Sequence, residues 1–468
     1  MTENILLPLV AKFNEYLSNY ILVFLLIGIG LWYSIKTRFV QIRCFFDGFR
    51  NIFGGSAKTS GKSEKNMNSF QALSTAVAGQ VGTGNIVGAA GAILIGGPGV
   101  LFWMWLIAFL GMATIYAEAS LAVKTRKTDP DGGVKGGPVY YINTAFTGKF
   151  GKFLSGFFAV AIILGLGFMG CMVQANSIGC SIQEAFNIPS WEIGVVLVVV
   201  CLFIYIGGIK RLASVSEKIV PFMSAIFILG ALSVLIMRIK YIPETFYLVF
   251  KYAFCPQAIL GGSFWYAISA TISQGVKRGL FSNEAGMGST PHVHALARDK
   301  TPHEEGTVAM IGVFIDSFAI LTLNALVIIS TMYTSDGPLA GGYNGAVTEI
   351  LNKNNLVQSA FSRIFDSSVG AMFVAVSLVF FAFSSILGWH LFGKINVLYL
   401  FKNRNPKTVK LIYSLISLAF VMLGTLSSSD FVWELTDMFN NLMVIPNVIA
   451  LFALTKLVLS CMEKKKKG

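Results

Sequence analysis

Charged residues are scarce in this chain of 468 residues. Asp, Glu, Lys and Arg make up 13% of it, whereas soluble globular domains carry about a quarter. A soluble domain with so few charges would precipitate. The four histidines and six cysteines show no zinc spacing and no disulfide framework. No cluster of carboxylates, histidines and a nucleophile is evident either, so we expect neither an enzyme nor a bound cofactor.

Apolar residues fill most of the sequence instead. Hydrophobic residues account for 54% of the chain, and the mean hydropathy is +0.68. Roughly 20 apolar residues cross a bilayer, and roughly eleven stretches reach that length. They begin near Tyr20, Phe70, Val100, Phe153, Trp191, Ala213, Gly262, Thr307, Ser367, Val409 and Glu434. The pattern predicts an all-α polytopic membrane protein.

Basic residues exceed acidic ones, which gives a net charge of +13. Such a charge can indicate nucleic-acid binding, but here the basic residues lie in short loops between the apolar stretches. Alternate loops are rich in them, from the loop after the first stretch, with Lys36, Arg38 and Arg43, to the C-terminal EKKKK. Because positive loops stay in the cytoplasm, we expect a cell-membrane protein in a lipid bilayer, with its N-terminus outside, its C-terminus cytoplasmic and no nucleic-acid partner.

The second apolar stretch is interrupted at its centre. Residues Gly79 to Asn85 read GQVGTGN, so three glycines and three uncharged polar side chains lie where hydrocarbon would surround them. Each unsatisfied N–H or C=O costs several kcal/mol in lipid, and a broken helix is tolerated only where it faces protein or a water-filled cavity. A binding site is the expected reason for such a discontinuous helix.

The seventh stretch predicts a second discontinuous helix. It is apolar until Ser273 and is then interrupted by Gln274, Gly275, Lys277, Arg278 and Gly279. With the first stretch set aside, the two interrupted stretches open two groups of five with opposite orientation, which is the hydropathy pattern of an inverted repeat. The division is residues 1–66 for an extra helix and a cytoplasmic interfacial segment, 67–240 for the first repeat, and 241–468 for the second repeat and the basic tail.

Two long motifs resemble a known family. The stretch from Phe70 to Ile142, with AGQVGTGNIVGAAG and GGVKGGPVYYI, is similar to the alanine/glycine:cation symporter family, and GVKRGLFSNEAGMGSTPHVHA, from Gly275 to Ala295, is similar to its other signature. The resemblance implies the amino acid, polyamine and organocation superfamily and a LeuT-type five-plus-five inverted repeat with one extra N-terminal helix. It also implies sodium-coupled import of alanine or glycine by alternating access. Nothing in the sequence demands an obligate oligomer, so we expect a monomer. Proton coupling, or a preference for glutamine or serine, is the alternative, and a channel or a membrane enzyme fits less well.

A zwitterionic amino acid in a low-dielectric site needs donors for its carboxylate and acceptors for its ammonium. Free N–H groups at the start of a half-helix suit the carboxylate, and these are expected at Thr83, Gly84 and Asn85. Carbonyls freed in the second interruption suit the ammonium, and these are expected around Ala270, Thr271, Ser273 and Gln274.

The resemblance adds three residues to this pocket. Gln174 would form a hydrogen bond with the substrate, while Phe168 and Trp389 would limit its size. A helix–helix hydrogen bond is the structural alternative for Gln174, and ordinary packing is the alternative for the two aromatic residues.

The resemblance also implies a sodium site. Sodium is a hard cation that carbonyl and hydroxyl oxygens satisfy without a carboxylate. In the inverted-repeat fold, the hydroxyls of Ser384 and Ser385 and the carbonyl of Phe381 would face the carbonyls of Ala78 and Val81. The alternative is that the two serines bond only to their own helix.

Asp316 lies well inside the eighth stretch, and an intramembrane carboxylate is a functional hypothesis by default. It could bind a cation, relay a proton or pair with Lys277 or Arg278, and we favour the ion pair. Glu434 and Asp437 open the last stretch and are expected at a solvated helix terminus.

Overall fold

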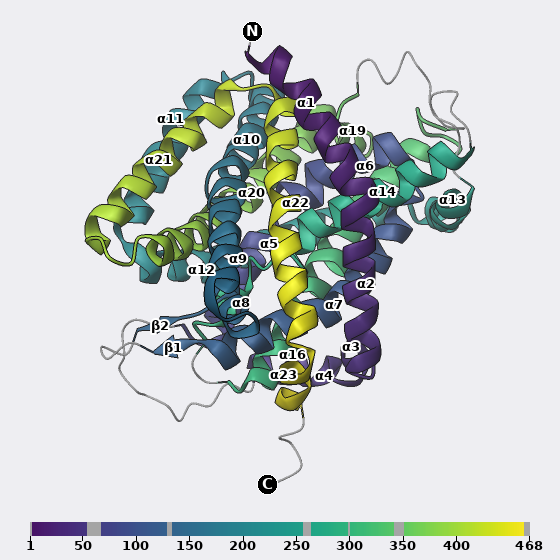
Figure 1. The fold of residues 1–468 in the computed structure, drawn as a ribbon. Helices are drawn as coiled ribbons and strands as arrows, with labels where there is room; N and C mark the ends of the chain where they lie inside the picture. The colour runs from purple at the N-terminus through teal and green to yellow at the C-terminus, as the bar shows by residue number, and fades with distance from the viewer. Residues whose placement is uncertain are drawn as a thin grey trace.

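In the computed structural model, residues 2–53, 67–128, 133–255, 264–297, 300–340 and 351–462 are described. They form a bundle of long helices with a small β-hairpin near its lower end, and the first and last described helices, residues 2–16 and 455–462, lie at opposite ends of the bundle (Figure 1). A helix satisfies its own backbone groups, so long apolar segments fold as helices in lipid. The prediction of an all-α protein is confirmed, apart from the small β-hairpin.

The N-terminal segment forms a long helical rod followed by two short helices. The rod packs along α22 and α7, and the chain then turns at Arg38 and Phe39, both with φ of 55°. The elements are α1 (Thr2–Tyr16), η1 (Leu17–Leu22), α2 (Val23–Lys36), α3 (Val40–Arg43) and α4 (Phe45–Phe53).

The middle of the chain carries the first discontinuous helix and the hairpin. Strands β1 (Lys127–Thr128) and β2 (Val134–Lys135) are antiparallel, with Lys127 opposite Lys135. The helices are α5 (Ser69–Gln80), η2 (Gly84–Gly88), α6 (Ala89–Gly96), α7 (Val100–Thr125), α8 (Pro138–Ala145), α9 (Gly148–Ile162), η3 (Ile163–Gly170), α10 (Cys171–Phe186), α11 (Ser190–Ile206) and α12 (Gly208–Met237).

The remaining elements return through the bundle, and α20 lies at its centre, in contact with α5, α10, α12 and α21. They are η4 (Ile239–Tyr241), α13 (Ile242–Phe254), α14 (Phe264–Asn283), α15 (Pro291–His294), α16 (Pro302–Val313), η5 (Phe314–Leu321), α17 (Thr322–Ile328), η6 (Ile329–Tyr333), α19 (Leu356–Ser362), α20 (Ser367–Leu400), α21 (Pro406–Leu426), α22 (Ser429–Ala453) and α23 (Thr455–Met462).

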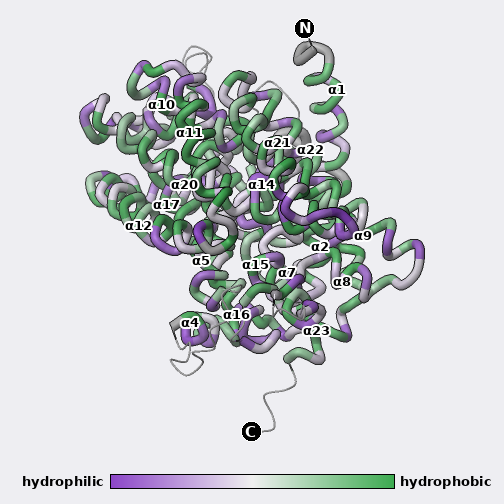
Figure 2. The backbone as a smooth tube through the Cα atoms, turned by 90° about the vertical axis from the view of Figure 1, so that its left-hand side faces the viewer, coloured by the Kyte–Doolittle hydropathy of each residue, from purple (hydrophilic) through white to green (hydrophobic). Residues whose placement is uncertain are grey.

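Within the described residues, seven helices are long and apolar enough to cross a membrane, and the pair formed by Ser69–Gln80 and Gly84–Gly96, bent by 44°, makes an eighth. Two shorter apolar helices, Val23–Lys36 and Ser190–Ile206, add to them. Figure 2 shows hydrophobic residues along most of α11, α12 and α21. The fold is therefore that of a multi-pass helical membrane protein.

Two glycines let α20 approach α5 backbone to backbone. A Cβ atom on Gly388 would lie 3.2 Å from both the Cα and the N atom of Gly79, which is tighter than ordinary van der Waals contact. Small residues at helix contacts permit such an approach. It brings Ser384 and Ser385, one turn earlier on α20, against the end of α5.

Replacing Gly388 by Ala should push α5 and α20 apart, because the atoms that its Cβ would meet belong to the backbone of α5. Overpacking of this kind costs about 1–3 kcal/mol. We expect a lower thermal unfolding temperature in detergent. Gly156→Ala, in α9, is the control, because a Cβ there meets nothing within 4 Å and alanine favours the helix. Equal unfolding temperatures for the two variants would contradict the close packing inferred here.

Candidate functional site

The first discontinuous helix is broken at residues 81–83, between α5 and η2, and we call this segment the first break. The helix begins regularly: the Asn68 side chain accepts from the Gln71 N–H, and the Gln71 side chain accepts from the Asn68 N–H. It ends at Gln80 because Val81 is extended, with φ of −78° and ψ of 95°. The carbonyls of the last turn of α5 therefore lack helical partners. The predicted interruption lies where the sequence placed it.

The five oxygens of the expected sodium site converge beside the first break. The Ser385 hydroxyl lies 2.9 Å from the Ala78 carbonyl oxygen, 3.4 Å from that of Val81 and 3.2 Å from that of Phe381. The Ser384 hydroxyl lies 2.8 Å from the Phe381 oxygen and 3.4 Å from the Ala78 oxygen. All five residues are buried. The two serines therefore do more than bond to their own helix.

Gln174 of α10 contacts the first break directly. Its Oε1 accepts a hydrogen bond of 3.2 Å from the Thr83 N–H, while its Nε2 and the Thr83 hydroxyl are buried without a partner among the described residues. The Asn85 N–H donates to the Gly82 carbonyl at 3.3 Å. Of the three expected carboxylate donors, Thr83 and Asn85 are thus bonded within the chain, and Gln174 occupies the place that a carboxylate would take at Thr83.

The prediction of an interruption at Gln274 to Gly279 is wrong. Helix α14 runs without a break from Phe264 to Asn283, and the second break lies at residues 284–290, where Glu284, Gly286 and Gly288 have φ of 56°, 94° and 76°.

Packing explains the glycines inside α14. A Cβ on Gly275 would lie 2.5 Å from Trp103 Cβ, and one on Gly279 would lie 2.4 Å from Ile107 Cγ2. They let α14 approach α7 closely, as small residues do between membrane helices.

The carbonyls expected to bind the ammonium therefore lie within a helix. Ala270, Thr271, Ser273 and Gln274 are all helical, and the Thr271 hydroxyl donates to the Gly96 carbonyl at 2.9 Å. Gly96 ends α6, thirteen residues beyond the first break. The structure thus places these residues away from the first break.

The position beside the first break is occupied instead by three residues that the sequence did not point to, Phe281, Ser282 and Asn283. A Cβ on Gly84 would lie 2.8 Å from Phe281 Cδ1 and 3.2 Å from Ser282 Cα. Gln80 Nε2 donates to the Asn283 carbonyl at 2.8 Å, so the two breaks meet. The signal that could have located them is the polar, glycine-rich run EAGMGST, which follows them directly.

Asp316 links the segments beside the two breaks and does not pair with Lys277 or Arg278. The buried carboxylate accepts from Asn85 Nδ2 at 2.6 Å, from the Ser282 hydroxyl at 2.8 Å and from the Ser317 hydroxyl at 2.8 Å. All of these donors are neutral. The favoured ion pair is therefore wrong.

Lys277 and Arg278 pair with Asp437 instead. Its carboxylate lies 2.7 Å from Lys277 Nζ and 3.0 Å from Arg278 Nη1. Its side chain is only 3% exposed, so the expectation of a solvated terminus is wrong for Asp437. Two cations in this position need a carboxylate, because an unpaired buried charge is costly.

Trp389 lies at the second break, and Phe168 does not. The Trp389 indole N–H donates to the Glu284 carboxylate, and its ring meets that of Phe281 edge to face at 5.8 Å between centroids. Phe168 stacks on Phe420 of α21 at 4.8 Å. Ordinary packing, the alternative for Phe168, therefore accounts for its position.

Glu118 of α7 fixes the second break. Its carboxylate accepts from the N–H groups of Gly286, at 3.1 Å, and Gly288, at 3.0 Å, and from the Asn447 amide. Backbone donors freed by the break are thus satisfied by one buried carboxylate. No group of three His, Cys, Asp or Glu side chains able to hold a metal occurs in the described part of the chain.

Comparison with protein families gives one match that covers almost the whole chain. The model of the sodium:alanine symporter family matches residues 3–467.

Several curated proteins are similar over nearly their full length. The putative sodium/proton-dependent alanine carrier protein YrbD of Bacillus subtilis is 38% identical, over 98% of this chain and 93% of its own. The sodium/alanine symporter AgcS of Methanococcus maripaludis is 35% identical, over 97% and 95%. The probable sodium/glutamine symporter GlnT of Bacillus subtilis is 33% identical, over 100% and 93%.

Among solved structures, a manganese transporter from Eremococcus coleocola has a similar fold. The TM-score is 0.54 at 14% sequence identity, over 84% of this chain and 85% of that one. At this identity the likeness concerns the fold alone.

Replacing Asp437 by Asn should strongly destabilise the protein, because Arg278 would lose its carboxylate and Lys277 would keep only Glu434, 4.0 Å away. Breaking a buried pair costs about 3–5 kcal/mol. We expect a clear loss of thermal stability in detergent. Asp430→Asn is the control, because Asp430 pairs with Lys353 and its side chain is 77% exposed; an exposed pair contributes about 0–1 kcal/mol. An Asp437→Asn protein as stable as Asp430→Asn would refute the buried cluster.

Proposed function

The chain belongs to the sodium:alanine symporter family, and from that premise we propose that it imports alanine or glycine together with sodium by alternating access. The family and its named relatives are transporters, which confirms that the chain is not an enzyme. The observation that carries the proposal is the convergence of five oxygens, from Ala78, Val81, Phe381, Ser384 and Ser385, at the first break.

Sodium suits this group of oxygens for a chemical reason. The site offers three carbonyls and two hydroxyls, which are hard, neutral ligands. A monovalent cation brings the charge that such a buried group lacks. The carbonyls of Ala78 and Val81 come from the end of α5 and the first break, while the Phe381 carbonyl and both hydroxyls come from α20. A bound ion would therefore hold the two segments together. Binding of sodium would therefore order the first break before the amino acid arrives.

The amino acid would bind beside the same break. Its carboxylate would take the Thr83 N–H from Gln174 Oε1, and Gln174 Nε2 and the Thr83 hydroxyl, both without a partner among the described residues, would add donors. Gly84 and Asn85 would complete the side of the site that faces the carboxylate. Phe281 and Trp389, in edge-to-face contact, would limit the size of the side chain, which favours alanine and glycine. Carbonyls at the second break would receive the ammonium.

The proposal also includes the arrangement of the membrane spans and the positions of the termini. Eleven spans would be arranged as an extra helix in residues 1–66 and two inverted repeats in residues 67–240 and 241–468. The N-terminus would lie outside and the C-terminus in the cytoplasm. The site oxygens all come from one chain, which supports a functional monomer.

Proton coupling is the second candidate, and Asp316 favours it. This carboxylate is fully buried, bonds only to neutral donors within the described part of the chain, and joins the segments beside the two breaks through Asn85 and Ser282. A group in that position could exchange a proton as the breaks move. One relative, YrbD of Bacillus subtilis, is named as a putative sodium/proton-dependent alanine carrier protein.

Ser385→Ala tests the sodium site. Loss of one hydroxyl that binds the ion should raise the half-saturating sodium concentration for alanine uptake by about tenfold or more. The measurement is uptake of labelled alanine into proteoliposomes over a range of sodium concentrations.

Ser377→Ala is the matched control, since Ser377 is buried on the same helix and its hydroxyl has no partner among the described residues. It should keep the wild-type sodium response. An unchanged response in Ser385→Ala would remove the ion assignment.

Asp316→Asn tests the second candidate. If Asp316 exchanges a proton during transport, uptake at fixed sodium should depend on pH in the wild type and lose that dependence in the variant, because an amide does not titrate. Asp430→Asn, at the surface, should keep the wild-type pH profile. A wild-type profile in Asp316→Asn would rule out proton exchange at this residue.

A further inference from the structure

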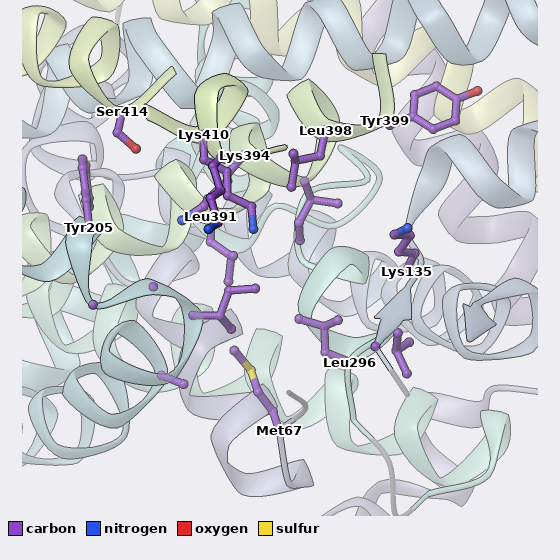
Figure 3. Close-up of a pocket in the computed structure, with 18 of the residues that line it drawn as sticks. Met67, Lys135, Tyr205, Leu296, Leu391, Lys394, Leu398, Tyr399, Lys410 and Ser414 are labelled. Carbon is purple, nitrogen blue, oxygen red and sulfur yellow. The ribbon is translucent and has the colours of Figure 1, made fainter. Parts of the chain in front are cut away.

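A cavity of about 1220 Å³ lies near the lower end of the bundle, outside the site described above. Its walls come from β1 and β2, the α11–α12 turn, the end of α20 and the start of α21, with Met67 and Gln71 at the start of α5. Figure 3 shows Lys394, Lys410 and Leu391 on one side of the cavity and Lys135 and Leu296 on another.

Positive charge collects around this cavity. Of the described residues that line it, none is acidic, and six are lysines: Lys127, Lys135, Lys394, Lys402, Lys407 and Lys410. Lys127 and Lys135 lie directly opposite each other across the hairpin, an arrangement of like charges that destabilises a strand pair. Lys394 and Lys410 repel each other, so an anion bound between them would stabilise this end of the molecule.

Lys394 makes the strongest case for a bound anion. The residue is only 8% exposed, and its ammonium has no hydrogen bond or ion pair with any described residue. Lys410 lies close enough to repel it electrostatically. Most of the side chain is buried while the residue lines the cavity, which limits the hydration of the ammonium, and the neighbouring lysine adds repulsion.

The rest of the lining is apolar and reaches the outer surface of the bundle. Leu202 and Ile206 of α11 and Leu411 and Leu415 of α21 line the cavity, and their side chains are 38%, 77%, 59% and 52% exposed. Both helices are hydrophobic along most of their length (Figure 2). In a bilayer these side chains would face acyl chains.

We propose that this cavity binds an acidic phospholipid, with its phosphate held by Lys394 and Lys410 and its acyl chains along α11 and α21. A free inorganic phosphate shares the headgroup chemistry but leaves the apolar wall uncovered. A zwitterionic amino acid carries no net charge that would offset that of the lysines. The proposal does not depend on sodium transport, and its test measures binding alone.

The test compares lipid binding by the full-length protein and by the variant Lys394→Met/Lys410→Met. Both proteins are placed in nanodiscs of phosphatidylcholine with a minor fraction of phosphatidylglycerol, and the lipids retained after extraction are counted by native mass spectrometry. Methionine keeps most of the length of the side chain, and the two substitutions remove like charges that repel each other, so the variant should fold. A lysine near a lipid phosphate favours binding of an acidic lipid, so we expect phosphatidylglycerol binding to weaken by about tenfold or more.

Lys456→Met is the matched control, because Lys456 is an exposed lysine of α23 that does not line the cavity. It should bind phosphatidylglycerol as the wild type does. Equal binding by the double variant and this control would overturn the proposal. A second arm adds inorganic phosphate to the detergent-solubilised protein. Thermal stabilisation by phosphate that requires Lys394, without phosphatidylglycerol binding, would overturn the assignment to a lipid.

Discussion

The first break leaves the carbonyls at the end of α5 without helical partners in the interior of a membrane protein, and the centre of the structure depends on how they are satisfied. Backbone groups cannot stay unpaired in hydrocarbon. The hydroxyls of Ser384 and Ser385 lie against them because Gly388 and Gly79 let α20 and α5 approach closely. These contacts place a set of neutral oxygens where a small cation can replace the hydroxyl protons as their partner.

The second break is built by different means. Glu118 accepts from the N–H groups of Gly286 and Gly288, while Asp437 neutralises Lys277 and Arg278 on the preceding helix. The two breaks are then joined by Gln80 and, through Asp316, by Asn85 and Ser282. A movement of one discontinuous helix must therefore disturb the other, which is what alternating access at a site between them would require.

Some of this could be predicted from the sequence, and some could not. The first break and the multi-pass helical fold were predicted from hydropathy. The grouping of the five oxygens in one sodium site was predicted from the family resemblance. The second break was misplaced because Gly275 and Gly279 look like helix interruptions, whereas they pack α14 against α7. The partners of Asp316, Asp437 and Phe168 depend on how distant helices pack, and a single sequence does not contain that information.

Coupling of amino acid movement to sodium is the central claim, and transport by the wild-type protein tests it most directly. Labelled alanine should accumulate in proteoliposomes only while an inward sodium gradient is present, at equal pH on both sides. Reversing the gradient should drive alanine out. Uptake to the same level at the same rate without sodium would contradict the account.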